Sequence, residues 1–203
     1  MGTDIEMYAE VRDGGRWRLA EPLVANEDYG GPGDDPPQPE LMPLGLYNDR
    51  NRALFAILGQ GAGPHYSEGP YHPVAPLRGL PPDVSPEVAA FARSRHDELF
   101  GQGWLGLDEL LAFDWHGQVI QKVAMVVPDV AHLFEGNPLG FPYSRWPAGE
   151  QISYSSWTRP GVSVRWRETY AEAAGSEFLG DVLPYLESFG PPGCVRIVFW
   201  FNA

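Results

Sequence analysis

Two carboxylates, Asp4 and Glu6, stand two residues apart near the start of the chain, where residues 4–12 alternate in polarity as a strand does. Side chains at that spacing share one face of a strand, with their backbones about 6–7 Å apart. Carboxylates so placed can divide the roles of general acid and base or share a divalent cation. They are therefore our candidate catalytic residues. The alternative is a solvated strand face on which Glu10 pairs with Arg18 across a hairpin.

A second group of chemically capable residues lies in the irregular stretch 59–82. His65 and His72 could ligate a metal, and Tyr66 lies beside the first of them. Their spacing matches no compact metal motif and no cysteine joins them, so they are weak candidates for a metal site. Polar loop residues that pack on the surface are the alternative.

Arginines next to irregular stretches form a third group. Arg50, Arg52 and Arg78 flank such stretches in a chain that is short of positive charge. An arginine fork can hold a ligand carboxylate or phosphate. We therefore expect Arg52, Arg78, Tyr66 and Trp104 to be ligand-binding candidates, with Trp104 lining a pocket. Ion pairs between these arginines and the surplus acids are the alternative.

Established catalytic motifs are absent from the sequence. It contains no Gly-x-Ser-x-Gly, no phosphate-binding or dinucleotide-binding glycine loop and no His-Glu-x-x-His. The single cysteine, Cys194, belongs to the apolar C-terminal run and is expected to be a structural thiol. The sequence therefore names no reaction and no cofactor.

Composition predicts one packed domain over residues 1–203. The chain has 43% hydrophobic and 13% aromatic residues, enough for a core. Its 27 acidic and 14 basic residues give a net charge of −13. Such a field repels phosphate backbones, so we expect no direct nucleic-acid binding. It suits a partner with a basic surface, although solubility alone is an alternative. The acidic start and the lack of a long apolar stretch predict a cytoplasmic protein without membrane contact.

The two ends of the chain both predict strands. The run 195–201 is apolar on both faces and should lie in the middle of a sheet. At the other end we predict a hairpin over 4–20. A three-residue loop, 13–15, pairs Val11 with Trp17 and keeps one apolar and one charged face. A two-residue Gly14-Gly15 loop would pair Val11 with Arg18, so we prefer the longer loop.

The remaining pattern predicts an α+β fold. Helices are expected over 51–58, 85–99, 107–113, 168–174 and 181–189, strands over 118–127, 151–157 and 161–167, and irregular surface segments over about 26–49 and 59–82. A helix over 118–127 is nearly as well supported as a strand. The sum is a mainly antiparallel sheet built from both terminal strands and the 151–167 pair, with helices on one face.

Several blocks of the sequence together resemble a family of small uncharacterised proteins of tailed bacteriophages and prophages, which typically begin Met-Gly-Cys-Asp-Ile-His. The blocks are Met1-Gly2-Thr3-Asp4-Ile5-Glu6, Asn51-Arg52-Ala53-Leu54-Phe55-Ala56, Arg78-Gly79-Leu80-Pro81, Asp83-Val84-Ser85, the stretch from Trp104 to Trp115, and the ending 195–201. Thr3 and Glu6 depart from the family pattern, as does Phe100-Gly101 where His-Ser is common. The resemblance implies an accessory gene product of phage or mobile-element type and supplies no catalytic residues.

We therefore expect a soluble, cytoplasmic accessory protein that acts by binding a host or element-encoded protein. The alternative is a small-ligand or metal-dependent enzyme with its site between the N-terminal strand and the 59–82 loop. In that case Asp4 and Glu6 would do the chemistry, and Arg52 or Arg78 would hold an anionic substrate.

Overall fold

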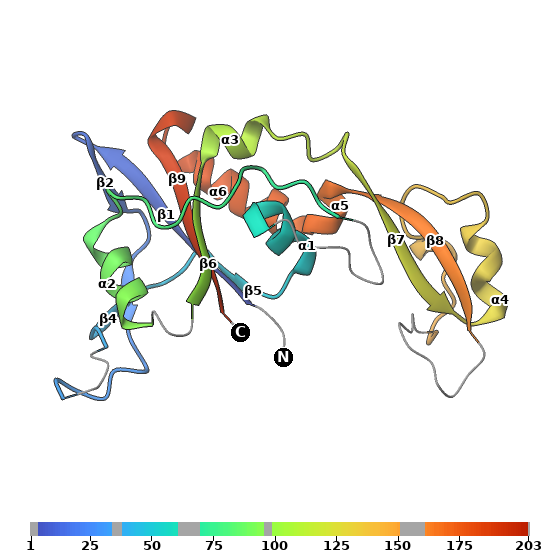
Figure 1. Ribbon diagram of the computed structural model, residues 1–203, viewed down its shortest axis with the longest axis horizontal. Helices are drawn as coiled ribbons and strands as arrows, with labels where there is room; N and C mark the ends of the chain where they lie inside the picture. Colours follow the sequence, from blue (N-terminus) through green and yellow to red (C-terminus); the bar gives the residue numbers. More distant parts are fainter. Residues whose placement is uncertain (1–3, 34–37, 61–69, 96–98, 151–160, 203) are drawn as a thin grey trace.

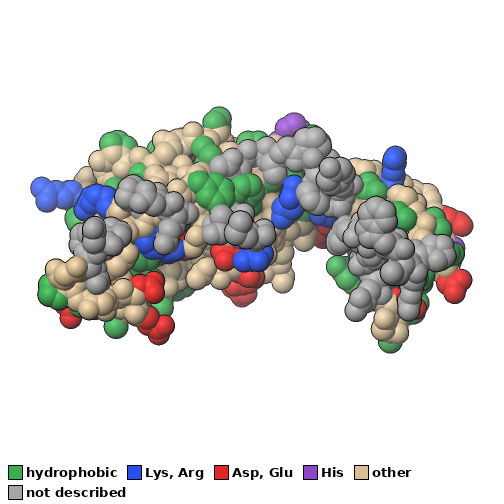
Figure 2. Space-filling model, turned by 60° about the horizontal axis from the view of Figure 1, so that its bottom comes forward, with side chains coloured by type: hydrophobic (Ala, Val, Ile, Leu, Met, Phe, Trp, Pro, Cys, Tyr) green, Lys and Arg blue, Asp and Glu red, His purple; other side chains and the backbone are tan. Residues whose placement is uncertain are grey.

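The computed structural model describes residues 4–33, 38–60, 70–95, 99–150 and 161–202 of the chain. Figure 1 shows an elongated molecule in which a strand pair and a short helix stand away from the larger part. We call residues 118–169 the arm and the rest the body. The space-filling view shows the same projection of the arm from the body (Figure 2).

The described elements follow in chain order. They are β1 (Asp4–Asp13), β2 (Arg16–Leu19), β3 (Leu23–Ala25), β4 (Leu41–Pro43), β5 (Tyr47–Asp49), α1 (Arg52–Phe55), a π turn (Ala56–Gln60), α2 (Pro86–Ser94), β6 (Leu99–Gly106), α3 (Leu107–Ala112), β7 (Val119–Val126), α4 (Pro128–Ala131), 3₁₀ turns (His132–Phe134 and Tyr143–Arg145), β8 (Val162–Thr169), α5 (Tyr170–Ala174), a π turn (Phe178–Val182), α6 (Leu183–Ser188), a 3₁₀ turn (Pro192–Cys194) and β9 (Val195–Asn202).

The main sheet is antiparallel and contains both terminal strands, which confirms the predicted α+β fold. Its order is β2-β1-β9-β6, and β5 also pairs with β1. β9 lies between β1 and β6, as its apolar faces predict, and all but its last residue are buried. Asp4 pairs with Asn202, so the first and last described strands run side by side (Figure 1).

Four helices, α1, α3, α5 and α6, lie on one face of this sheet, α2 lies on the other, and α4 belongs to the arm. Ile5, Met7 and Phe199 pack on the first face in one cluster with residues of α1, α3 and α6. The opposite face presents Tyr8 and Trp200 to Val88 and Phe91 of α2. Both faces of β1 and β9 are therefore covered, which buries side chains that an alternating pattern assigns to solvent.

The predicted hairpin register is wrong. Val11 pairs with Arg18 and Asp13 with Arg16, so the loop has two residues. Gly14 and Gly15 have φ of 56° and 85°, which suits the two-residue turn that matches strand twist. The predicted register depended on keeping a charged face of β1 in water. Because this face is buried, that requirement does not restrict the register. The shorter loop also places Trp17 on the Glu10 side of the sheet.

Several segments differ from expectation because pairing partners lie far away in sequence. The helix predicted to reach Leu99 ends at Ser94, and Leu99 starts edge strand β6. The segment 26–49 is not wholly irregular, since it contains β4 and β5. The predicted 161–167 strand is β8, but it pairs with β7 in a separate two-stranded sheet. The expected 151–157 strand lies outside the described residues.

Other local predictions are confirmed. The 118–127 segment is strand β7, and α1 is capped by the Asn51 side chain, which accepts from the Leu54 N–H at 2.9 Å. Gly175, with φ of 89°, ends α5. From 70 to 82 the chain is irregular, yet Tyr71 and Ala75 are buried in the main cluster. The second irregular segment is thus packed against the body where it is described.

Buried hydrophobic residues form three clusters. Two lie on the two faces of the main sheet, and the third belongs to the arm, where Phe134 and Trp166 are central. The single domain over 1–203 stays a prediction. Within the described ranges, no helix combines the length and the apolar character needed to cross a bilayer.

Candidate functional site

The first predicted carboxylate, Asp4, is held by an arginine. Arg50 Nε donates to Asp4 Oδ1 at 2.7 Å and Nη2 to Oδ2 at 3.2 Å. This hydrogen bonding lowers the pKa of Asp4, and the same contact raises the pKa of Arg50. The pair is exposed on the body surface. Asp4 is therefore a charged acceptor already satisfied by its neighbour.

The second carboxylate, Glu6, is buried and accepts from four side chains. The donors are Arg95 Nη1 at 2.7 Å, Trp200 Nε1 at 2.8 Å, Tyr8 Oη at 3.1 Å and Asn202 Nδ2 at 3.3 Å. Burial, and next the charge of Glu6, raises the pKa of Tyr8. So many fixed donors leave this carboxylate little capacity to bind a substrate or a cation.

Only some of the other candidates near the irregular stretch 59–82 are among the described residues. His65 and Tyr66 lie outside the described residues. His72 is exposed, and its backbone N–H donates to the Tyr170 hydroxyl at 2.9 Å. Arg52 is exposed at the start of α1. Across the described ranges, no three His, Cys, Asp or Glu residues are grouped so that they could hold a metal ion.

Two predicted residues, Arg78 and Trp104, do come together. The Arg78 guanidinium carbon lies 4.7 Å from the centroid of the Trp104 ring. Both line a cavity of about 310 Å³, which we call the tryptophan cavity. Its lining comprises Trp17, Arg78, Trp104, Gly106, Asp108, Glu109, Pro192, Gly193, Val195 and Arg196.

Arg78 is already paired at the edge of this cavity. Its Nη1 donates to Glu109 Oε2 at 2.8 Å, and its Nη2 bonds the other carboxylate oxygen. This pairing lowers the pKa of Glu109 and raises that of Arg78. Glu109 also accepts from the Gly106 N–H, which fixes the start of α3. The anion-binding fork expected at Arg78 thus holds an internal carboxylate.

Sequence reasoning missed Arg196 and Trp17. Arg196 is 3% exposed and bonds Glu10, which is fully buried, with Nε to Oε2 at 2.7 Å. Its Nη1 donates to Asp83 Oδ1 at 2.8 Å, which lowers the pKa of Asp83. The Trp17 ring centroid lies 4.1 Å from its guanidinium carbon. A lone arginine inside an otherwise apolar strand was the signal that could have identified this site.

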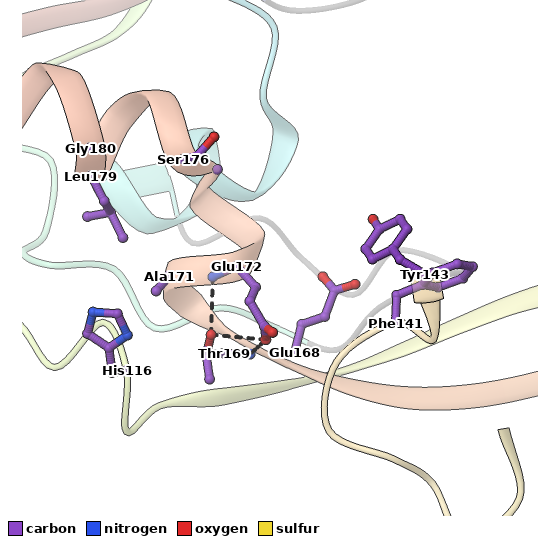
Figure 3. Close-up of a pocket in the computed structure, with 11 residues that line it drawn as sticks. His116, Phe141, Tyr143, Glu168, Thr169, Ala171, Glu172, Ser176, Leu179 and Gly180 are labelled. Atoms are coloured by element: carbon purple, nitrogen blue, oxygen red, sulfur yellow. Dashed lines mark hydrogen bonds between the residues drawn. The ribbon is translucent and has the colours of Figure 1, made fainter. Parts of the chain in front are cut away.

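A larger hollow lies where the arm joins the body. Its volume is about 760 Å³, and we call it the arm-base hollow. It is lined by His116, Phe141, Tyr143, Glu168, Thr169, Ala171, Glu172, Gly175, Ser176, Leu179 and Gly180 (Figure 3). The close-up shows aromatic rings from the arm on one side and the α5 segment, with its carboxylates, on the other.

The carboxylates of the arm-base hollow are positioned by local structure. Thr169 caps α5: its Oγ1 accepts from the Glu172 N–H at 3.1 Å, and Glu172 Oε2 accepts from the Thr169 N–H at 2.8 Å (Figure 3). Glu168 Oε1 accepts from Trp166 Nε1 at 2.6 Å. The Tyr143 ring packs against Phe141 at a tilt of 52°, with a centroid separation of 4.6 Å, and Tyr143 is 79% exposed.

Acidic residues continue from this hollow along α5 and α6. Between residues 168 and 195 the sequence has five acids and no lysine or arginine. Glu172, Glu177, Asp181 and Glu187 are exposed, and we call these four residues the acidic face. Tyr185, on the same segment, is 47% exposed. The acidic face and the arm-base hollow share Glu172.

Comparison of the chain with models of protein families, with curated proteins and with solved structures finds no match. The functional argument therefore depends on the geometry described above.

Proposed function

We propose that this is a binding protein whose partner presents a basic segment to the acidic face, with one cationic side chain in the arm-base hollow. The supporting observation is the unbroken acidic stretch, exposed at Glu172, Glu177, Asp181 and Glu187, next to a hollow that an exposed aromatic ring lines. The resemblance to phage proteins suggests an accessory product of phage or mobile-element type, which would act on a host or element-encoded protein. The single cysteine suits a cytoplasmic protein, and the net charge of −13 disfavours contact with nucleic acid.

The lining of the hollow suits an ammonium or guanidinium group. Carboxylates form charge-assisted hydrogen bonds with such cations, and the face of an aromatic ring attracts them. Glu172 supplies a carboxylate whose Oε1 has no hydrogen-bond partner among the described residues, and Phe141 and Tyr143 supply the rings. Glu168 already holds Trp166 and Lys122 and contributes only its negative charge. Four exposed acids within one segment of the chain would also accelerate association with a basic partner, and this effect weakens as salt rises.

The enzyme alternative has less support in the geometry. Asp4 already accepts hydrogen bonds from Arg50, and Glu6 already accepts hydrogen bonds from four side chains. Arg78, which was expected to hold a substrate, instead pairs with Glu109 in the tryptophan cavity. Each candidate group therefore has an internal partner that a substrate would have to displace.

The test is a titration with peptides of equal length that are rich in arginine, lysine or glutamate. We expect the basic peptides to bind and the acidic one to fail, with affinity falling as salt increases. Glu172→Gln keeps the capping acceptor of α5 but removes a charge, and it should weaken binding several-fold. Asp129→Asn, an equal charge change on the arm, should bind as wild type does. Equal binding of acidic and basic peptides, or wild-type binding by Glu172→Gln, would overturn the proposal.

A further inference from the structure

The tryptophan cavity has features that the proposed partner site does not use. The other described tryptophans each contact an aromatic ring: Trp115, Trp146, Trp166 and Trp200. Within the described part of the chain, Trp17 and Trp104 contact no aromatic ring, and their faces meet arginines instead. Both are partly exposed and line the same cavity. Because both rings are partly exposed, the indole surface that the arginines leave uncovered is open to the cavity.

Both arginines of the cavity are held by carboxylates. Arg196 lies beneath both indoles, 4.1 Å from the Trp17 centroid and 5.7 Å from that of Trp104. It is held by Glu10 and Asp83, and Arg78 is held by Glu109. Because each arginine already bonds a carboxylate, a simple anion would have to displace an internal partner. A free phosphate or carboxylate is therefore a poor fit.

Two polar groups of the cavity have no internal hydrogen-bond partner among the described residues, one an acceptor and one a donor. They fit a ligand that both donates and accepts hydrogen bonds along one edge. Asp108 lines the cavity, is exposed, and forms no hydrogen bond or ion pair with the described residues. Its carboxylate is an acceptor for N–H donors. Arg78 uses Nη1 and Nη2 for Glu109, so its Nε–H stays available as a donor. Asp108 lies near Arg78, since its charge contributes to the raised pKa of that arginine.

Size and shape narrow the ligand further. The cavity volume of about 310 Å³ accommodates a bicyclic ring with a small substituent, and Gly106 and Gly193 contribute no side chains to its wall. Flat π systems stack on indole faces and on guanidinium planes. Ring N–H groups paired with a carboxylate add directional selectivity.

We infer that the tryptophan cavity binds a planar nitrogen heterocycle of the nucleobase class, stacked on the indoles of Trp17 and Trp104 and hydrogen-bonded through its N–H edge to Asp108. This site lies apart from the arm-base hollow, so it is an activity in addition to the proposed partner binding.

The experiment is a titration of intrinsic tryptophan fluorescence, repeated by calorimetry, with guanosine, adenosine, ribose and inorganic phosphate as separate probes. We expect a nucleoside to quench the fluorescence and ribose and phosphate to leave it unchanged. Asp108→Asn should weaken nucleoside binding at least ten-fold, as should Trp17→Leu. Asp129→Asn, far along the chain on the arm, is the matched charge control and should bind as wild type does.

The outcomes separate this inference from the proposed function. Failure of both nucleosides to bind at millimolar concentration would overturn the inference, as would wild-type affinity in Asp108→Asn. Binding of phosphate alone with similar affinity would also overturn it, because stacking would then be unnecessary. If Trp17→Leu does not fold, Asp108→Asn still decides the question, since the side chain is exposed and keeps its size. Peptide binding at Glu172 tests the other site independently.

Discussion

The body and the arm of this protein both have hydrophobic clusters, but the body also buries ion pairs. The body buries Glu6 and Glu10 against Arg95 and Arg196, side chains that arrive from elements far along the chain. Within the described residues, the arm cluster is formed by hydrophobic and aromatic side chains, with Phe134 in contact with several rings. Ion pairs demand matched partners, whereas an aromatic cluster needs only volume and ring geometry.

The two regions also differ in net charge. Residues 118–169 contain five basic and four acidic residues, whereas the rest of the chain contains nine basic and 23 acidic. The net charge of −13 therefore belongs to the body. The acidity is therefore a property of the body, and the proposed site for a basic partner uses acids from this part of the chain.

The largest effect should follow from breaking the buried pair in the body. Glu10→Gln leaves Arg196 buried without its full counter-charge, and removal of one partner of a buried pair costs about 3–5 kcal/mol. Denaturant unfolding measures this loss. Asp13→Asn breaks an exposed pair with Arg18 and should cost under about 1 kcal/mol. Similar losses in the two variants would remove the distinction between buried and exposed pairs.

An equally large effect is expected in the arm, but confined to it. Phe134→Ala removes a buried ring from the aromatic cluster, and such truncations cost about 3–5 kcal/mol. We expect hydrogen exchange of β7 and β8 amides to accelerate while β1 and β9 amides keep their protection. Uniform acceleration throughout the chain would show that the arm and the body unfold as one unit.

The third effect depends on pH and concerns the body. Glu21 is buried, and Oε2 accepts from the Ala9 N–H at 2.9 Å, while Oε1 has no partner among the described residues. Burial raises its pKa from 4.5 to about 7. The folded protein therefore holds a proton that the unfolded chain releases between these values, so this group lowers stability as pH rises through that window.

Glu21→Gln removes this dependence while keeping an acceptor for Ala9. Above pH 8 we expect the variant to be more stable than the wild type by roughly 2–4 kcal/mol, and near pH 4 the difference should vanish. Urea unfolding at several pH values provides the measurement. A difference between the two proteins that stays constant with pH would contradict the assignment.

The smallest effect should come from the joint between the two regions. Lys122, the only lysine in the chain, reaches from β7 to the Tyr71 hydroxyl at 3.3 Å and to Glu168 Oε2 at 3.8 Å. Lys122→Met should cost about 1 kcal/mol, since the group is partly screened by water. Faster hydrogen exchange near residues 70–75 and 119–123 would report a looser joint. Arg165→Met, an equal charge loss at an exposed position of β8, should leave this exchange unchanged.

Local signals predicted much of the fold. Pro86 after Ser85 marks the start of α2, and Gly175 ends α5. The doubly apolar run at the end of the chain is the central strand β9. These features were predictable because each depends on the backbone preferences of a few residues or on the hydrophobic pattern of neighbouring residues.

The candidate sites were less predictable. Arg78 and Trp104 were identified as ligand-binding candidates and do line one cavity, but Trp17 and Arg196 join them only through the pairing of β2, β1, β9 and β6. The arm-base hollow depends on the separate β7–β8 sheet, whereas the sequence predicted that its second strand belongs to the main sheet. Strand pairing across long separations has no local signature.

The sequence by itself determined the α+β class, the central position of the last strand and the acidic balance, because these follow from composition and short-range periodicity. Only the tertiary structure decided that the polar face of β1 is an interior. Arg95 reaches Glu6 across 89 residues and Arg196 reaches Glu10 across 186. The alternating pattern of a strand is the same whether its carboxylates face water or a guanidinium from a distant segment. Only the tertiary structure shows that these carboxylates and their arginine partners are buried.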